Sequence, residues 1–247
     1  MTTTAARRPR AYVRVRGPDA LDFLQRMLSN DVSGESCEAL LLTPKARLIA
    51  PVLVWRRRED DFLLLTEPEL GETLRSALLR ACFAARCEIE AEEHVSTIVL
   101  GEAEGGIPNR DYGVAAVELL DSDVAATGSE DELERLRIAA ATPRWGRELD
   151  DRVLPAEAGL DERAISFTKG CYPGQEPVAR QRYRGKVNRR LRVLDVESAE
   201  PGAEIFHGEK AVGRVTSAVP GLALGYVRVE VPDGAELRIA GNPARLH

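Results

Sequence analysis

The sequence predicts an α+β domain followed by a small β-barrel, and three observations support this fold class. Strand-like and helix-like segments alternate in the first part of the chain, but without the steady period of a parallel β–α–β series. From Leu191 onward, turns containing glycine and proline separate short β-rich segments, and no helical pattern is visible. Of the 247 residues, 44% are hydrophobic and 30% are charged, which is typical of a globular protein with an ample core.

The first part of the chain begins with a predicted helix after Pro18-Asp19, where Leu21, Leu24 and Leu28 recur at helical spacing behind an acidic residue. The segment 69–85 is the clearest amphipathic helix, and 130–140 is expected to form another. Apolar runs predict strands at 40–42, 48–54, 62–65, 95–100 and 114–120.

In the second part, Val227, Val229 and Val231 alternate with charged residues, which is typical of a half-buried strand. We expect about sixty residues to form the barrel, since several short strands follow one another at this spacing. The boundary falls in the segment 184–190, which divides the chain into units 1–186 and 187–247.

Charge is distributed unevenly along a chain whose formal net charge is −6. Residues 169–192 carry eight basic residues and a single acidic one, and residues 1–18 carry five arginines and no acid. A positive patch on an acidic body favours a particular anionic ligand over general nucleic-acid binding, although the segment 1–18 is equally compatible with a solvated basic face. The longest apolar stretch, 48–55, is far too short to cross a bilayer. We therefore expect a monomer that contacts no membrane and no nucleic acid directly.

The cysteines Cys37, Cys82, Cys87 and Cys171 lie at irregular spacings, and the three histidines are scattered. This pattern predicts neither a disulfide framework nor a metal site, and it fits a reducing cytoplasm. Packing in the core is the expected role of the first three cysteines.

One segment is expected to carry chemistry: Lys169-Gly170-Cys171-Tyr172-Pro173-Gly174-Gln175-Glu176, followed by Arg180. Two glycines and a proline around a cysteine predict a tight turn in which backbone N–H groups can approach a ligand. Cys171 is a nucleophile only as a thiolate, which Lys169 and Arg180 would favour, and the alternative is a small buried apolar residue. Gln175 suits hydrogen bonding to a heterocycle, and Glu176 suits moving a proton.

The octet 169–176 resembles the signature of the YgfZ-type folate-binding proteins, which are relatives of the aminomethyltransferase (T-protein) of the glycine cleavage system. The likeness extends along essentially the whole chain. Further matching positions are Ala20, Phe23-Leu24-Gln25, Ser29-Asn30-Asp31-Val32, Leu42-Thr43-Pro44-Lys45-Ala46-Arg47, Trp145-Gly146, Pro155, Glu157, Ile165-Ser166-Phe167, Arg184-Gly185, Arg190-Leu191, and Gly213 with Val215-Thr216-Ser217.

The resemblance implies a T-protein-like folate-binding module with a central folate-sized channel over 1–186, followed by a C-terminal β-barrel over 187–247. It implies tetrahydrofolate or another folate derivative as cofactor. The family's role implies a folate-linked accessory protein for the assembly or repair of iron–sulfur enzymes, with an indirect effect on tRNA modification. The partners would be folate and iron–sulfur enzymes or cluster-assembly proteins. The alternative is a tetrahydrofolate-dependent aminomethyl (one-carbon) transferase.

By the same resemblance, Cys171 is the functionally central residue, and no metal ligands are assigned. The residues expected to bind the cofactor, at the junction of the two parts, are Asp31, Lys169, Gly170, Tyr172, Gly174, Gln175, Glu176 and Arg180. Asp31 follows the first helix, where it either faces the channel or caps the helix.

Two further features bear on folate. Ala139 stands where relatives have a glutamate that would hydrogen-bond the pterin, so we expect weakened folate binding. Arg180, Arg182 and Arg184 alternate with other residues, and in an extended chain they would share one face. Such a stripe suits the carboxylates of a polyglutamate tail, an RNA, or an acidic protein surface.

Overall fold

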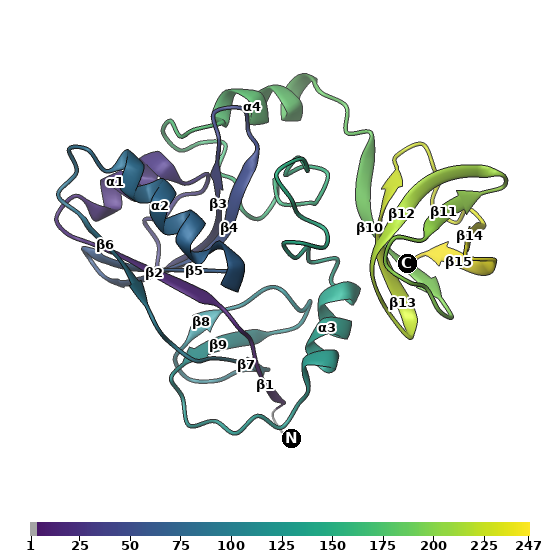
Figure 1. Ribbon diagram of the computed structural model, residues 1–247, viewed down its shortest axis with the longest axis horizontal. Coiled ribbons are helices and arrows are strands. Elements are labelled where there is room, and N and C mark those ends of the chain that lie inside the picture. The colour runs from purple at the N-terminus through teal and green to yellow at the C-terminus, as the bar shows by residue number, and fades with distance from the viewer. Residues whose placement is uncertain (1–3) are drawn as a thin grey trace.

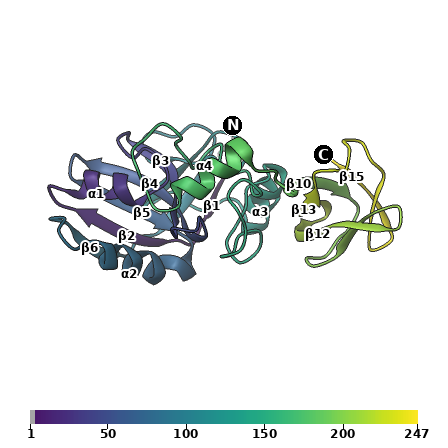
Figure 2. The ribbon, with the colours of Figure 1, turned by 90° about the horizontal axis from the view of Figure 1, so that it is seen from above.

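The computed structural model describes residues 4–247 and contains two antiparallel sheets with four helices, beside a closed barrel (Figure 1). Seen from above, the barrel forms one end of an elongated molecule (Figure 2). The prediction of an α+β part followed by a β-barrel is confirmed. No helix within 4–247 has both the length and the apolarity needed to cross a membrane.

The larger sheet has five strands in the order β3-β4-β5-β2-β6. Helices α1 (Ala20–Met27) and α2 (Gly71–Ala81) pack on one face, where Phe23 and Leu74 meet Val52 and Leu64. The other face is also covered, so every residue of β5 is buried. The strands are β2 (Ala11–Arg16), β3 (Ser36–Leu42), β4 (Leu48–Arg58), β5 (Asp61–Thr66) and β6 (Glu88–Glu92).

The smaller sheet has the order β1-β7-β9-β8. Helix α3 (Glu130–Ala139) packs against it, with Leu133 in the same apolar cluster as Ala6 and Ile98. Its strands are β1 (Ala5–Arg7), β7 (Ser96–Leu100), β8 (Ile107–Pro108) and β9 (Ala116–Leu120).

The barrel has the strand order β10-β13-β12-β11-β14-β15, and β15 pairs back with β10 to close it, Leu246 opposite Leu194. Its interior holds only small and branched apolar side chains such as Ile205 and Val215. Gly225 is required where two strands approach, because a Cβ there would lie 2.5 Å from the Arg214 carbonyl oxygen. The strands are β10 (Arg189–Val196), β11 (Glu204–His207), β12 (Lys210–Val219), β13 (Gly221–Arg228), β14 (Leu237–Ile239) and β15 (Asn242–Leu246).

A buried polar network joins the barrel to the first part. Arg137 on α3 donates to Glu148 at 2.9 Å and to the Ser217 hydroxyl at 2.8 Å. Ser217 donates to the other Glu148 oxygen at 2.6 Å, and the Tyr226 hydroxyl donates to the Glu148 carbonyl at 2.9 Å. Because Ser217 and Tyr226 belong to barrel strands, these bonds fix how the barrel sits on the first part.

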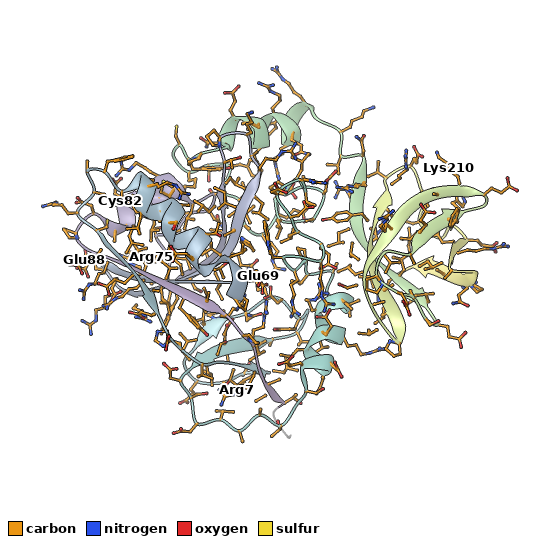
Figure 3. The ribbon with its side chains drawn as sticks, viewed as in Figure 1. Arg7, Glu69, Arg75, Cys82, Glu88 and Lys210 are labelled. Carbon is orange, nitrogen blue, oxygen red and sulfur yellow. The ribbon has the colours of Figure 1, made fainter. Side chains whose placement is uncertain are left out.

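Several predicted bounds need correction. The helix predicted over 69–85 is shorter in the structure. A short 3-10 turn, η1 (Pro68–Leu70), precedes α2, which ends at Ala81, so that Cys82 lies just after the helix (Figure 3). The strand predicted through Val231 ends at Arg228, where the chain turns. Strands β1, β2 and β6 were not predicted. The five arginines of the segment 1–18 do not form a free patch, because four of them are paired with carboxylates: Arg8 with Glu67, Arg10 with Glu118, Arg14 with Asp61, and Arg16 with Glu88.

Candidate functional site

The octet forms a turn that leads into helix α4 (Gln175–Arg184), directly above the β3–β4 hairpin (Figure 1). Gly174 precedes the helix with φ +84°, a left-handed conformation that favours glycine. A Cβ at this position would lie 2.7 Å from the Thr43 carbonyl oxygen and 3.1 Å from Ala46 Cα. The backbone of the octet therefore packs directly on the loop between β3 and β4.

Cys171 and Tyr172 face opposite sides of this turn. The Cys171 side chain is exposed, whereas Tyr172 is 7% exposed and packs with Leu40, Ala46 and Val178. Burial raises the pKa of Tyr172 to about 12. The tyrosine ring thus anchors a backbone that holds the neighbouring thiol in solvent.

Lys169 fastens the start of the octet to the end of α1. Its ammonium donates to the carbonyl oxygens of Leu28 at 2.8 Å and Asn30 at 2.7 Å. Burial lowers the pKa of Lys169 to about 8, although nearby Asp31 acts in the opposite direction. Lys169 was expected to polarise the Cys171 thiol, but its hydrogen bonds are made with the backbone at the end of α1.

Asp31 closes a turn behind α1. Its carboxylate accepts hydrogen bonds from the Ser33 backbone N–H at 2.9 Å and from the Gln25 amide. Hydrogen bonds from Ser33, and then from Gln25, lower the pKa of Asp31. Asp31 therefore lies near Lys169, and its carboxylate stabilises the local turn.

The predicted stripe of three arginines on an extended chain is wrong, because residues 175–184 are helical. Arg180 and Arg184 lie one turn apart, while Arg182 leaves the helix on another side and stacks 4.2 Å from the centre of the Phe167 ring. Arg180 pairs with exposed Glu176 at 3.0 Å. A proline and an acid in the first turn, with arginines in the last, are the sequence features that favour this helix.

The other three cysteines are partly buried. Burial raises the pKa of Cys37 to about 12 and that of Cys87 to about 11. Within residues 4–247, no cluster of three or more His, Cys, Asp or Glu side chains is arranged to hold a metal ion.

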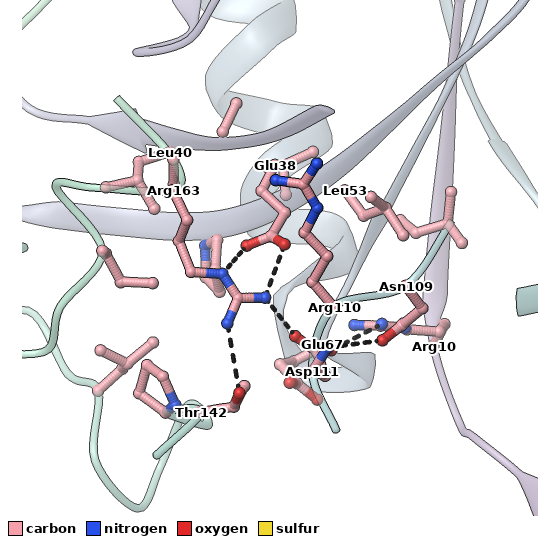
Figure 4. Close-up of a pocket in the computed structure, with 18 residues that line it drawn as sticks. Arg10, Glu38, Leu40, Leu53, Glu67, Asn109, Arg110, Asp111, Thr142 and Arg163 are labelled. Atoms are coloured by element: carbon pink, nitrogen blue, oxygen red, sulfur yellow. Dashed lines mark hydrogen bonds and ion pairs between the residues drawn. The ribbon is translucent and has the colours of Figure 1, made fainter. Parts of the chain in front are cut away.

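A central cavity lies between strands β3, β4 and β5 of the larger sheet and the segments 109–111 and 142–164, and sequence reasoning did not find its polar residues (Figure 4). The Arg163 guanidinium donates to both carboxylate oxygens of Glu38, through Nε to one and through a terminal nitrogen to the other at 2.6 Å. The same terminal nitrogen also donates to Asp111 at 3.0 Å. Deeper in, Arg10 and Glu118 form a buried bidentate pair with two 3.0 Å bonds. Burial raises the pKa of Glu38 even though Arg163 lowers it.

None of the predicted site residues lines this cavity. Ala139, the position of the family glutamate, is exposed at the end of α3 and does not line it either, whereas Thr142 and Pro143 do. The free space is about 60 Å³, whereas small-molecule pockets commonly hold about 300–1,000 Å³. The cavity is therefore too small to hold a pterin ring.

The fold and the site together define the class of protein: an α+β module, a closed C-terminal β-barrel, and an exposed thiol just before α4. Residues 188–247 match the CAF17 C-terminal β-barrel domain family. An uncharacterized protein of Haemophilus influenzae is 30% identical over 84% of this chain and 81% of its own length. The human mitochondrial iron–sulfur cluster assembly factor IBA57 is 28% identical over 94% of this chain and 82% of its own length.

Among solved structures, the glycine cleavage system aminomethyltransferase T of Bartonella henselae is similar in fold, with a TM-score of 0.83 and 21% identity. The match covers 99% of this chain and 85% of that one. The chain belongs to the YgfZ/CAF17-type family.

Proposed function

We propose that this protein is a folate-linked accessory protein for the assembly or repair of iron–sulfur enzymes, with Cys171 as its working thiol. The observation that carries the proposal is how the octet holds Cys171: the lysine before it is tied to α1, the tyrosine after it is buried, and Gly174 packs on the β3–β4 loop. The thiol is exposed on a fixed backbone. Similarity to a protein named as an iron–sulfur cluster assembly factor supports this role.

The chemistry favours action on a partner's cluster. Iron–sulfur clusters are usually held by four thiolates. Here the other three cysteines are partly buried, and burial raises the pKa values of Cys37 and Cys87. They are therefore poor candidates to ligate a cluster together with Cys171. A single exposed thiolate can ligate an iron atom of a cluster that another protein presents.

The β3–β4 loop and the end of helix α4 carry cations that suit a partner with acidic groups. Lys45 on the β3–β4 loop and Arg184 and Lys186 at the end of α4 are exposed, and they form no ion pair with any residue of 4–247. Unpaired cations on an acidic protein attract an anionic surface and speed its docking. The partners proposed are therefore iron–sulfur enzymes or cluster-assembly proteins in the cytoplasm, with tRNA modification affected only through such an enzyme.

A folate derivative, tetrahydrofolate in the first instance, is the proposed cofactor, and its contacts are proposed at Asp31, Lys169, Gly170, Tyr172, Gly174, Gln175, Glu176 and Arg180. Calorimetry with the purified protein and a reduced folate tests this part separately. Aminomethyl transfer from a lipoyl-carrying protein to tetrahydrofolate by the purified protein would favour the alternative, a one-carbon transferase.

The decisive experiment complements a strain that lacks the protein. Cys171→Ser is expected to fold normally and to lose rescue of an iron–sulfur enzyme whose activity depends on the protein. Cys82→Ser, a partly buried cysteine outside the octet, serves as the control and should rescue. Full rescue by Cys171→Ser would overturn the proposal.

A further inference from the structure

A pocket opens in the barrel where the strand predicted through Val231 stops short. Strand β13 ends at Arg228, and the chain then turns through 229–233 and leaves Val229 52% exposed. The pocket is lined from β10, β13, this turn and the end of β15, and its free space is about 310 Å³. Small-molecule pockets commonly hold about 300–1,000 Å³, and the mouths of β-barrels are among the places where they occur.

The floor of the pocket is the apolar interior of the barrel. Val227, which lies opposite Arg190 in the β10–β13 ladder, and Val231 both line the pocket and belong to the barrel's interior cluster. Leu194 on β10 belongs to the same cluster. Because alternate residues of a strand share one face, Arg190 and Arg192 continue the inward row of Leu194. These two arginines therefore stand at the open end of the barrel, here called the barrel mouth.

The charges at the barrel mouth are mainly positive. Arg190, Arg192 and Arg228 line the pocket together with a single acid, Asp233. Asp233 pairs with Arg192 at 2.8 Å and is 85% exposed. Arg228 lies 3.9 Å from Glu230, which is beyond hydrogen-bond distance. Arg190 is exposed and forms no ion pair with any residue of 4–247. Two guanidinium groups are thus available to an anion.

The combination of free guanidinium groups and an apolar floor selects a ligand that has both characters. A guanidinium binds a carboxylate through two parallel N–H donors. An apolar body placed over Val229 and the valines beneath it would remove apolar surface from water, which is favourable. Asp233 at the rim disfavours a second negative charge on the ligand, since like charges repel. The lining therefore fits a monocarboxylate that carries an alkyl group.

We propose that the barrel mouth is a binding site for a small alkyl carboxylate. The carboxylate meets Arg190 and Arg228, and the alkyl group covers Val229 and the apolar floor. The site shares no residue with the octet or with the central cavity. The inference goes beyond the proposed function and does not depend on it.

Calorimetry with the full chain and hexanoate tests the proposal. Hexanoate should bind about tenfold or more tightly than acetate, which has the same head group but a much smaller apolar body. Hexylamine, which carries the opposite charge on a similar chain, should not bind. Arg190→Ala should weaken hexanoate binding about tenfold or more, because a charge-assisted contact is lost. Arg238→Ala, an exposed arginine on β14 outside the pocket, should bind hexanoate as the wild type does.

Two further variants separate the head group from the apolar body. Arg190→Lys keeps the charge but loses the planar fork, so it should retain part of the affinity. Val229→Asp removes the apolar contact and adds a negative charge, so it should weaken hexanoate binding. Both positions are exposed, and the melting temperatures should stay near that of the wild type.

Three outcomes would overturn the proposal. They are the absence of hexanoate binding at millimolar concentrations, equal affinities for hexanoate and acetate, and hexanoate binding that survives both Arg190→Ala and Val229→Asp. The complementation test with Cys171→Ser involves none of these residues, so failure of one proposal is distinguishable from failure of the other.

Discussion

Neighbouring residues of the octet have opposite environments. Tyr172 lies in the apolar cluster beneath α4, and Cys171 is exposed above it. Burial matters to thiol chemistry in two ways, because it blocks reagents and raises the thiol pKa. Both effects act on Cys37 and Cys87.

Alkylation of the native protein should therefore modify Cys171 first. Short pulses of iodoacetamide followed by peptide mass mapping measure the order, and we expect Cys37, with a pKa near 12, to react last. In Cys171→Ser the fast phase should vanish. Rapid modification of Cys37 or Cys87 ahead of Cys171 in the folded protein would contradict the structure.

Lys169 gives stability a pH dependence of predictable sign. Its pKa is lowered from 10.5 to about 8 by burial, so the folded protein holds the proton less firmly than the unfolded chain. Between about pH 8 and 10.5 unfolding takes up a proton, and rising pH stabilises the folded state.

The free energy of unfolding of wild type minus that of Lys169→Met isolates this contribution from other titrating groups. We expect the difference to increase as pH rises from about 8 to 10.5. Urea titrations at several pH values measure it. A constant or falling difference would mean that the ammonium is not buried as described.

At the scale of the element, α4 depends on Gly174 to seat its first turn on the β3–β4 loop. Gly174→Ala should lower the free energy of unfolding by about 1–3 kcal/mol, because φ is +84° and the Cβ meets backbone atoms. Gly170→Ala is the matched control, since nothing lies within 4 Å of its Cβ position, and its effect should stay within about 0.5 kcal/mol. Equal melting temperatures for the two variants would show that α4 does not pack there.

Elements with strong apolar periodicity were predictable from sequence. The strand expected at 95–100 is β7, Ser96–Leu100, and the helix expected at 130–140 is α3, Glu130–Ala139. Strand β2 was missed because its arginines point outward and their partners, such as Asp61 and Glu88, lie far along the chain. Only the assembled sheet shows that these charges are neutralised.

In the candidate site, too, contacts between residues far apart in the sequence could not be predicted from local patterns. The octet predicted a glycine-dependent turn, which the structure contains, but it left open whether Cys171 is a reactive thiol or a buried apolar residue; the structure exposes it. The alternation of Arg180, Arg182 and Arg184 suggested an extended stripe, but helix-favouring residues around them decide the local structure. The central pair of Glu38 and Arg163 is separated by 125 positions, so no local pattern could reveal it.

At the scale of the whole molecule, the first part and the barrel are joined through Arg137 and Glu148. Arg137→Met should cost about 3–5 kcal/mol, because it leaves the Glu148 carboxylate, whose side chain has no exposed area, without its cation. Thermal unfolding measures the loss. Removing both charges with Arg137→Met and Glu148→Leu should recover most of it.

Arg135→Met is the control for this prediction, since Arg135 lies on the same helix and also reaches the barrel, at the Pro220 carbonyl, but is exposed. Its effect should remain within about 0.5 kcal/mol. A similar loss in Arg135→Met and Arg137→Met would assign the effect to α3 as a helix and not to the buried charge.

Closure of the barrel by β15 has a consequence for synthesis on the ribosome. Strand β10 begins at Arg189, but one of its edges stays unpaired until residues 242–246 have emerged. Both sheets of the first part draw their strands from residues 5–120, so they can pair while the barrel is still an open ribbon. The nascent chain therefore exposes a bare strand edge late, when the folded first part already provides the surface on which the ribbon docks.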